Sequence, residues 1–175
     1  MRYSAEQLTA DRVIERLKLS PLQPEGGYFK QIFKSEISID FLYDGDSERV
    51  SRSLMTGIYY LITPNDFSLL HRVRGTEIFH FYIGDPVEMI QFSAHSELKE
   101  ITMSSNIFSG HELQVAVPPM QWQALRLRSG GSFALMGTNV VPGFEYSDFE
   151  IGLRSDLISK FPKYAKQIHE YTKGD

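Results

Sequence analysis

The chain contains no cysteine and a single tryptophan among its 175 residues. Without cysteine, disulfide bonds, thiolate metal sites and cysteine nucleophiles are all excluded. The lack of cysteine fits a reducing compartment, where structural disulfides are rare. We therefore expect a cytoplasmic protein.

Long apolar runs and an excess of positive charge are also missing. No stretch approaches the run of about 18 apolar residues that a membrane helix needs. Residues 1–6 carry no apolar signal core. The formal net charge of −4 disfavours nucleic acid and anionic membranes as the main partner. We expect a small-molecule ligand, no nucleic acid and no membrane.

The length and composition are those of one globular domain. Domains commonly contain about 100–200 residues, and this size buries a core without covalent staples. The 12 phenylalanines and 9 tyrosines suit strands around an apolar interior. We predict a single domain over residues 1–175, with an N-terminal helix at about 5–18, a barrel at about 27–153 and C-terminal helices at about 155–172.

Helical patterns are confined to the two ends. Residues 4–19 place apolar side chains at helical spacing, and either Ser4 or Thr9 can serve as the N-cap. Near the other end, Ser155 and Asp156 can cap a terminal helix that Pro162 interrupts.

Between these ends the chain is a succession of short strands. Residues 28–35 form the first, residues 40–51 form an acidic, solvated loop, and turn signals separate most of the others. The remaining predicted strands are Met55–Ile62, Phe67–Val73, Glu77–Gly84, Val87–Phe92, Lys99–Met103, Leu113–Val117, Gln123–Leu127 and Phe133–Val141. Many short strands without intervening helices indicate an all-β sandwich or barrel and not a parallel βαβ fold.

Strand alternation predicts which side chains converge. His71 and Val73 share one face of their strand, and Glu77 lies on the inward face of the next. A hairpin turn at residues 74–76 would bring His71 beside Glu77. His80 falls on the opposite face, so we interpret it as a structural histidine.

The same alternation predicts the walls of an interior pocket. Gln123 shares the apolar face of its strand, and we expect it to join the polar floor. The predicted ligand-binding residues are Tyr60, Phe79, Phe81, Gln123 and Leu125. Such an aromatic-lined interior can hold a small ligand with a few convergent polar groups.

The spacing of the polar residues resembles the two motifs of the cupins. In cupins the first motif is His-x-His, three or four residues, Glu, six residues, Gly. This chain matches it at His71, Glu77 and Gly84, with Val73 in place of the second histidine. The second motif is Pro-x-Gly-x-x-His, and here the run Pro-Pro-Met-Gln-Trp-Gln ends at Gln123.

More narrowly, the chain resembles a family of small cupins long known as a domain of unknown function. The resemblance rests on residues 24–29, 71–86, 117–123 and 142–150, in that order. It implies an all-β fold with flanking helices, a cupin jelly-roll β-barrel (double-stranded β-helix). It also implies a homodimer, and a structural likeness to the dTDP-4-dehydrorhamnose 3,5-epimerases.

Two positions at which cupins carry a metal-binding histidine are altered in this chain, to Val73 and Gln123. Zinc or iron is usually held by about three protein ligands, with imidazole as the common nitrogen donor. His71 and Glu77 remain good donors, Gln123 is a weak neutral one, and Val73 has no donor atom. We expect no resident metal, with a weak divalent site at His71, Glu77 and Gln123 as the alternative.

The remaining hypotheses concern chemistry. A histidine beside a carboxylate in an apolar barrel is suited to proton abstraction next to a carbonyl. We take His71 as the base, Glu77 as its orienting group and Tyr146, or Tyr60, as the returning acid. The leading function is a carbohydrate-type (nucleotide-sugar-like) isomerase or epimerase; the alternatives are a non-catalytic ligand-binding cupin and a metal-dependent cupin enzyme.

Overall fold

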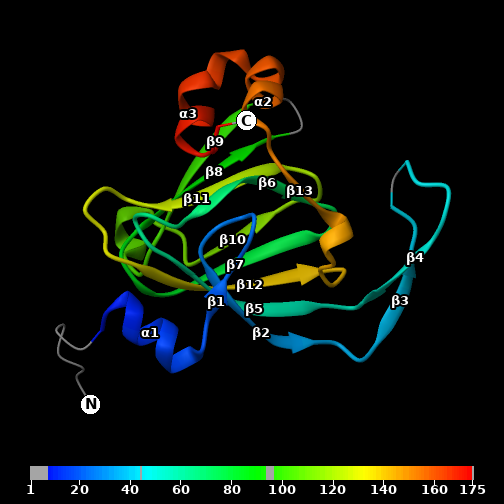
Figure 1. Ribbon diagram of the computed structural model, residues 1–175, viewed down its shortest axis with the longest axis horizontal. Coiled ribbons are helices and arrows are strands. Elements are labelled where there is room, and N and C mark those ends of the chain that lie inside the picture. The colour runs from blue at the N-terminus through cyan, green and yellow to red at the C-terminus, as the bar shows by residue number, and fades with distance from the viewer. Residues whose placement is uncertain (1–7, 44, 94–96, 175) are drawn as a thin grey trace.

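The computed structural model describes residues 8–43, 45–93 and 97–174. Over these residues the chain forms antiparallel sheets with short helices at both ends (Figure 1). One sheet has the strand order β1-β2-β5-β12-β7-β10, and the other has the order β13-β6-β11-β8-β9. The predicted all-β fold with flanking helices is confirmed.

The predicted strands correspond to β2 and β5–β12, each within one residue at both ends, whereas β1 and β13 in the two sheets were not among the predicted strands. The first sheet contains β1 (Ser20–Pro21), β2 (Tyr28–Lys34), β5 (Thr56–Ile62), β7 (Thr76–Gly84), β10 (Gln114–Val117) and β12 (Ala134–Val141). The second contains β6 (Ser68–Val73), β8 (Val87–Phe92), β9 (Leu98–Met103), β11 (Trp122–Leu127) and β13 (Phe149–Ile151).

The N-terminal helix α1 (Ala10–Leu17) packs on the outer face of the first sheet. Its N-cap is Thr9, whose hydroxyl oxygen accepts the backbone N–H of Arg12, while Ser4 lies outside the described residues. The apolar side of the helix buries Val13 against Leu135 and its neighbours, which anchors the helix to the sheet.

The C-terminal helices cover the outer face of the second sheet (Figure 1). They are α2 (Arg154–Lys160), the 3₁₀ turn η4 (Pro162–Tyr164) and α3 (Ala165–Glu170); two further 3₁₀ turns are η2 (Ile107–Ser109) and η3 (Tyr146–Asp148). The N-cap of α2 is Leu153, so the predicted cap at Ser155 and Asp156 is wrong, because the helix already begins at Arg154, soon after β13 ends at Ile151. No helix in the described ranges has the length and apolar character needed to cross a membrane.

Residues 38–43 and 45–53 form a protruding hairpin that we call the arm. It consists of β3 (Ser38–Phe41) and β4 (Val50–Ser53), and Figure 1 shows it extending away from the two sheets. The prediction of a loop at residues 40–51 was therefore wrong at its ends, where the two short strands satisfy each other's backbone groups.

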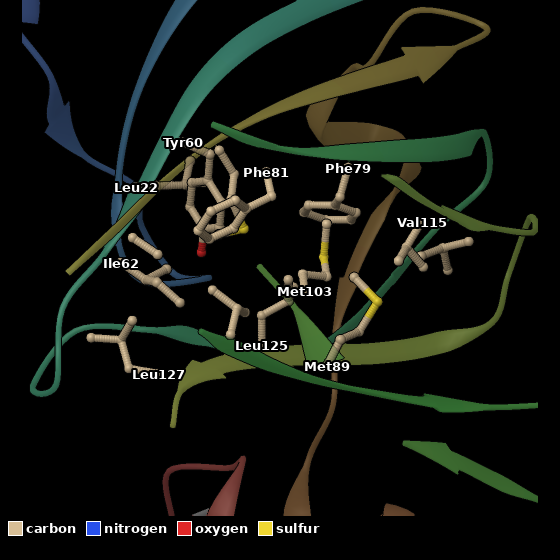
Figure 2. Close-up of a cluster of buried hydrophobic side chains, with 14 residues drawn as sticks. Leu22, Tyr60, Ile62, Phe79, Phe81, Met89, Met103, Val115, Leu125 and Leu127 are labelled. Atoms are coloured by element: carbon tan, nitrogen blue, oxygen red, sulfur yellow. The ribbon is translucent and has the colours of Figure 1, made fainter. Parts of the chain in front are cut away.

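The interior between the sheets is the main hydrophobic core. Figure 2 shows Tyr60, Phe79, Phe81 and Leu125 directed toward one another from both sheets. The exposed fractions of Phe79 and Leu125 are 1% and 0%. Alternation along β7 is as predicted, because Glu77, Phe79 and Phe81 are buried while the residues between them are more exposed.

His80 lies on the outer face of β7, as predicted. Its Nε2 is 2.8 Å from Oδ1 of Asn139, and the side-chain amide of Gln114 is 2.9 Å from its Nδ1. Both ring nitrogens therefore have partners, which fits a structural histidine.

The connection at Arg74 and Gly75 is not the predicted hairpin turn. β6 pairs with β11 and β13, whereas β7 pairs with β10 and β12, so this link carries the chain from one sheet to the other. As a result, His71 and Glu77 approach each other across the interior and not within one sheet.

Candidate functional site

A cavity of about 280 Å³ opens between the first sheet and the loop that follows β12. It contains two carboxylates that are largely buried and an apolar wall, with polar and charged side chains among the more exposed positions. Its lining consists of Leu22, Glu25, Phe29, Gln31, Lys34, Ile58, Glu77, Thr138, Val140, Phe144, Glu145 and Tyr146.

His71 lies behind the two buried carboxylates. Its ring is 1% exposed, and its Nε2 is 3.7 Å from Oε2 of Glu77 and 3.9 Å from Oε1 of Glu25. The Nδ1–H donates to the carbonyl oxygen of Leu69 at 2.8 Å, and the ring stacks on Phe149 with a centroid distance of 5.3 Å. The backbone contact therefore leaves Nε2 as the nitrogen that faces the carboxylates.

Gln123 completes the group from the neighbouring strand. It is paired in register with His71 between β11 and β6, and its side-chain amide donates to Oε2 of Glu77. The amide nitrogen is 3.4 Å from Nε2 of His71. The predicted trio of His71, Glu77 and Gln123 is thus brought together by the fold.

We use the name polar floor for the group formed by His71, Gln123, Glu77 and Glu25. The charges of its ionisable side chains are coupled. Burial alone lowers the pKa of His71, but the carboxylates of Glu25 and Glu77 outweigh burial and raise that pKa to about 9. The ring therefore carries a positive charge at neutral pH. Burial raises the pKa of Glu25 above its usual value, although the nearby His71 opposes the rise.

Glu25 is the member of the floor that the sequence analysis missed. Its segment, residues 24–29, contributes to the sequence analysis only as one of the four stretches that carry the family resemblance. The available signal was that Glu25 is the one charged residue in the stretch 19–29.

The other predicted site residues fall into two groups. Tyr146 lines the cavity, is 61% exposed, and meets Phe144 edge to face at a centroid distance of 5.3 Å. The structure places the predicted wall residues Tyr60, Phe79, Phe81 and Leu125 in the packed core, and none of them lines this cavity.

The donor set does not fit a tightly held metal ion. Within residues 8–43, 45–93 and 97–174, no three His, Asp or Glu side chains are arranged to hold one. Val73, at a position where cupins carry a histidine, is buried and has no donor atom. Gln123 turns its amide N–H toward Glu77, and a metal ion would have to displace the proton that Glu25 and Glu77 stabilise on His71.

Comparisons with known proteins follow the fold. The uncharacterized protein YML079W of Saccharomyces cerevisiae is 26% identical over 132 residues, which are 71% of this chain and 66% of the yeast protein. This chain therefore spans about two thirds of that relative.

Solved structures resemble the chain over almost its whole length. A hypothetical protein from Leishmania major has a TM-score of 0.86 and 27% identity, covering 94% of this chain and 99% of that one. Protein SO0799 from Shewanella oneidensis has a TM-score of 0.83 and 25% identity, covering 96% and 99%.

A more distant structure shares the fold alone. Oxalate decarboxylase from Bacillus subtilis has a TM-score of 0.53 and 9% identity, covering 91% of this chain and 38% of that one.

The family of the chain follows from a match to a family model. Residues 11–152 match the model of the family described as Cupin superfamily (DUF985). Because this match extends over most of the chain, the protein belongs to the DUF985 family of the cupin superfamily.

Proposed function

We propose that this cupin binds a small hydroxyl-rich molecule in its cavity and isomerises or epimerises it by proton transfer, as a carbohydrate-type enzyme. The observation that carries the proposal is the polar floor, in which one buried imidazolium faces two buried carboxylates beside an apolar wall. Groups whose proton affinities are shifted by burial and by each other are typical of acid–base sites.

The floor supports a division of roles. Glu77 reaches the cavity, whereas His71 is almost fully buried behind it. With a pKa of about 9, His71 holds its proton at neutral pH, so it supplies positive charge near the ligand instead of acting as the resting base. Charge fixed in a dry site stabilises the negative charge that develops on an enolate oxygen.

The wall and the mouth suit a sugar-like ligand. Phe29 and Phe144 offer apolar faces to the C–H side of a sugar ring, and Gln31 and Lys34 offer donors to hydroxyl or anionic groups. Tyr146 lines the same cavity and supplies a phenol that can return a proton. These features favour a nucleotide-sugar-like molecule among carbohydrates.

A cytoplasmic homodimer is part of the same proposal. The dimer is supported by the large side chains exposed on the first sheet, such as Phe33 at 47% and Tyr82 at 46%. Light scattering after size exclusion would give twice the chain mass for a dimer and the chain mass for a monomer.

Deuterium wash-in tests the reaction. The purified protein is incubated in heavy water with a panel of aldoses, ketoses and keto-sugar nucleotides, and loss of C–H signals is followed by proton NMR. We expect exchange in at least one compound, with reductions of about 100-fold or more in His71→Gln and Glu77→Gln. The control is Glu100→Gln, an exposed residue of β9 outside the cavity, which should behave like the parent protein.

Two results would contradict the proposed reaction. Exchange that persists at the parent rate in both variants would mean that the charges of His71 and Glu77 contribute nothing to the reaction. A compound that raises the melting temperature without any exchange would identify a non-catalytic binding protein, since ligand excess alone stabilises the folded state.

A further inference from the structure

The turn at residues 24–27 has a backbone that only glycine permits. Gly26 has φ +106°, and a Cβ atom there would lie 2.1 Å from the carbonyl oxygen of Phe67. Gly27 has φ +77°, and a Cβ atom would lie 2.8 Å from the carbonyl oxygen of Leu61. Both positions are therefore closed to any side chain.

Hydrogen bonds from three directions then fix this turn. The N–H of Leu69 donates to the carbonyl oxygen of Glu25 at 2.9 Å, and the buried Tyr60 hydroxyl donates to that of Gly26 at 2.9 Å. The N–H of Gly27 donates to the Asp66 carboxylate at 2.9 Å. The backbone of Glu25 is thus held against both sheets, which is more than a connecting turn requires.

The outcome of this bracing is the position of one side chain. Glu25 lines the cavity and its side chain is 14% exposed. Its Oε1 accepts the Ser68 hydroxyl at 2.9 Å and lies 3.9 Å from Nε2 of His71. A carboxyl group is thereby presented to a ligand from a nearly dry site.

The two carboxylates of the floor are not equivalent. Oε2 of Glu77 accepts the Gln123 amide and lies 3.7 Å from His71, and its side chain is 8% exposed. Glu25 has a neutral hydroxyl as its close partner and the larger exposure. Burial also raises the pKa of Glu25 above that of an ordinary glutamate, so its carboxylate is a stronger base than an exposed one.

We propose that Glu25 is the catalytic residue that takes the proton from the bound ligand, and that the glycine turn serves to hold it at the cavity. This inference rests on the isomerase or epimerase function proposed above. Glu77, at the cavity wall, and His71, behind it, then stay paired with each other and do not exchange protons with the ligand.

The step is a proton transfer at a carbon next to a carbonyl. The C–H bond breaks, its electron pair moves into an enolate, and the proton forms an O–H bond on Glu25. The enolate carbon then takes a proton from the Tyr146 phenol, which inverts the centre, or from Glu25, which restores it. After inversion Glu25 loses its proton to solvent and Tyr146 regains one, so the protein returns to its starting state.

The experiment compares Glu25→Gln, Glu25→Asp and Glu100→Gln by wash-in with the sugar panel described above, using the compound that the parent protein exchanges fastest. We expect Glu25→Gln to lose at least about 100-fold in kcat with KM changed by less than about threefold, because the amide keeps shape but accepts no proton. Glu25→Asp should regain part of the rate, and Glu100→Gln should match the parent.

A second measurement needs no substrate. Carbon-13 NMR of protein labelled at glutamate carboxyls should show one resonance that titrates above the ordinary glutamate range and is missing from Glu25→Gln, with Glu25→Asp as the assignment check if the amide variant does not fold. A resonance of Glu25 that titrates at or below the ordinary value would overturn the inference.

The wash-in results separate the two proposals. If the parent exchanges and Glu25→Gln keeps more than about a tenth of the rate, the role of Glu25 is wrong and the proposed function stands. If the parent exchanges nothing in the panel, the proposed function is wrong, and the role of Glu25 falls with it.

Discussion

The space between the two sheets has two regions of opposite character. Around Phe79 and Leu125 it is closely packed and apolar, and several of its side chains have no measurable exposure. Around His71 it is polar, and a cavity of about 280 Å³ reaches the neighbouring Glu25 and Glu77. The same strands supply both regions, since β7 carries Glu77 and Phe79 on one face.

The comparison shows what fixes each region. In the apolar region an inward side chain could be replaced by another apolar one of similar size, because its main contribution is the burial of apolar surface. In the polar region each residue has named partners, such as Leu69 for Nδ1 of His71 and Gln123 for Glu77. A substitution in the first region should therefore change stability, and one in the second should change charge and chemistry.

The largest effect should come from the apolar region. Phe79→Ala removes a ring that is 1% exposed, and we expect the free energy of unfolding to fall by about 4 kcal/mol, from lost transfer energy and the cavity left behind. Urea denaturation measures the change. A loss below about 1 kcal/mol would mean that this region is loosely packed and that the contrast with the polar region is false.

The polar region should instead make the free energy of unfolding depend on pH. The pKa of His71 is raised from 6.5 to about 9 when the protein folds, so its charge stabilises the fold fully below pH 6.5. That contribution, on the order of 3 kcal/mol, is lost as the pH rises through about 9.

The measurement is the free energy of unfolding at pH 7 and pH 10 in the parent and in His71→Gln. The parent should lose more stability over this interval, and the difference between the two proteins isolates the imidazolium facing Glu25 and Glu77. Equal losses in both proteins would show that His71 is already neutral at pH 7.

A smaller effect is expected where the arm meets η3 (Tyr146–Asp148). Arg52 of β4 donates two hydrogen bonds to Asp148, at 2.7 and 2.8 Å, and the Asp148 side chain is 4% exposed. Asp148→Asn should cost about 2 kcal/mol, because a buried charged hydrogen bond is weakened.

The matched control is Glu145→Gln. Its partner is Lys34 at 2.8 Å, but both side chains are about half exposed, so we expect a change below about 0.5 kcal/mol. Thermal denaturation of the two variants side by side gives the ranking. If Glu145→Gln proves the more costly change, burial is not what strengthens the Asp148 pair.

The smallest effect should follow removal of metal. Because His71 carries a proton and Gln123 donates to Glu77, we expect a chelator to leave the melting temperature unchanged and elemental analysis to find well below one ion per chain. A chelator-dependent fall in melting temperature would revive the weak site at His71, Glu77 and Gln123.

Much of the fold could be predicted because strand alternation is a local property. The inward faces of His71, Glu77 and Gln123 followed from period-two spacing, and the structure confirms their burial. The link at Gly75 could not be predicted, since a short turn joins strands within one sheet or between two sheets with the same local signals. The prediction that His71 lies near Glu77 was therefore correct, but it rested on a hairpin turn that the structure does not contain.

The position of the cavity could not be predicted from the sequence, because it depends on contacts between distant parts of the chain. Phe79 and Phe144 are both aromatic, yet Phe79 fills the core while Phe144, on the loop after β12, lines the hollow. That difference depends on how a loop and a strand far apart in the chain come together. The place of Glu25 in the site could not be predicted, because adjacent glycines indicate a bend without showing where the neighbouring side chain points.

The Leu69 carbonyl that holds Nδ1 of His71 also limits the proton count of the floor. With that nitrogen occupied, protons can be gained or lost only at Nε2 and at the two carboxyls. With His71 charged, the floor has one negative charge when both glutamates are ionised and none when Glu25 holds a proton. A cationic ligand would favour the ionised form of Glu25 and so release the proton from those molecules that hold one there, whereas an uncharged polyol would leave the proton count unchanged. Calorimetry in buffers of different ionisation heat would thus reveal the charge of the ligand before its identity is known.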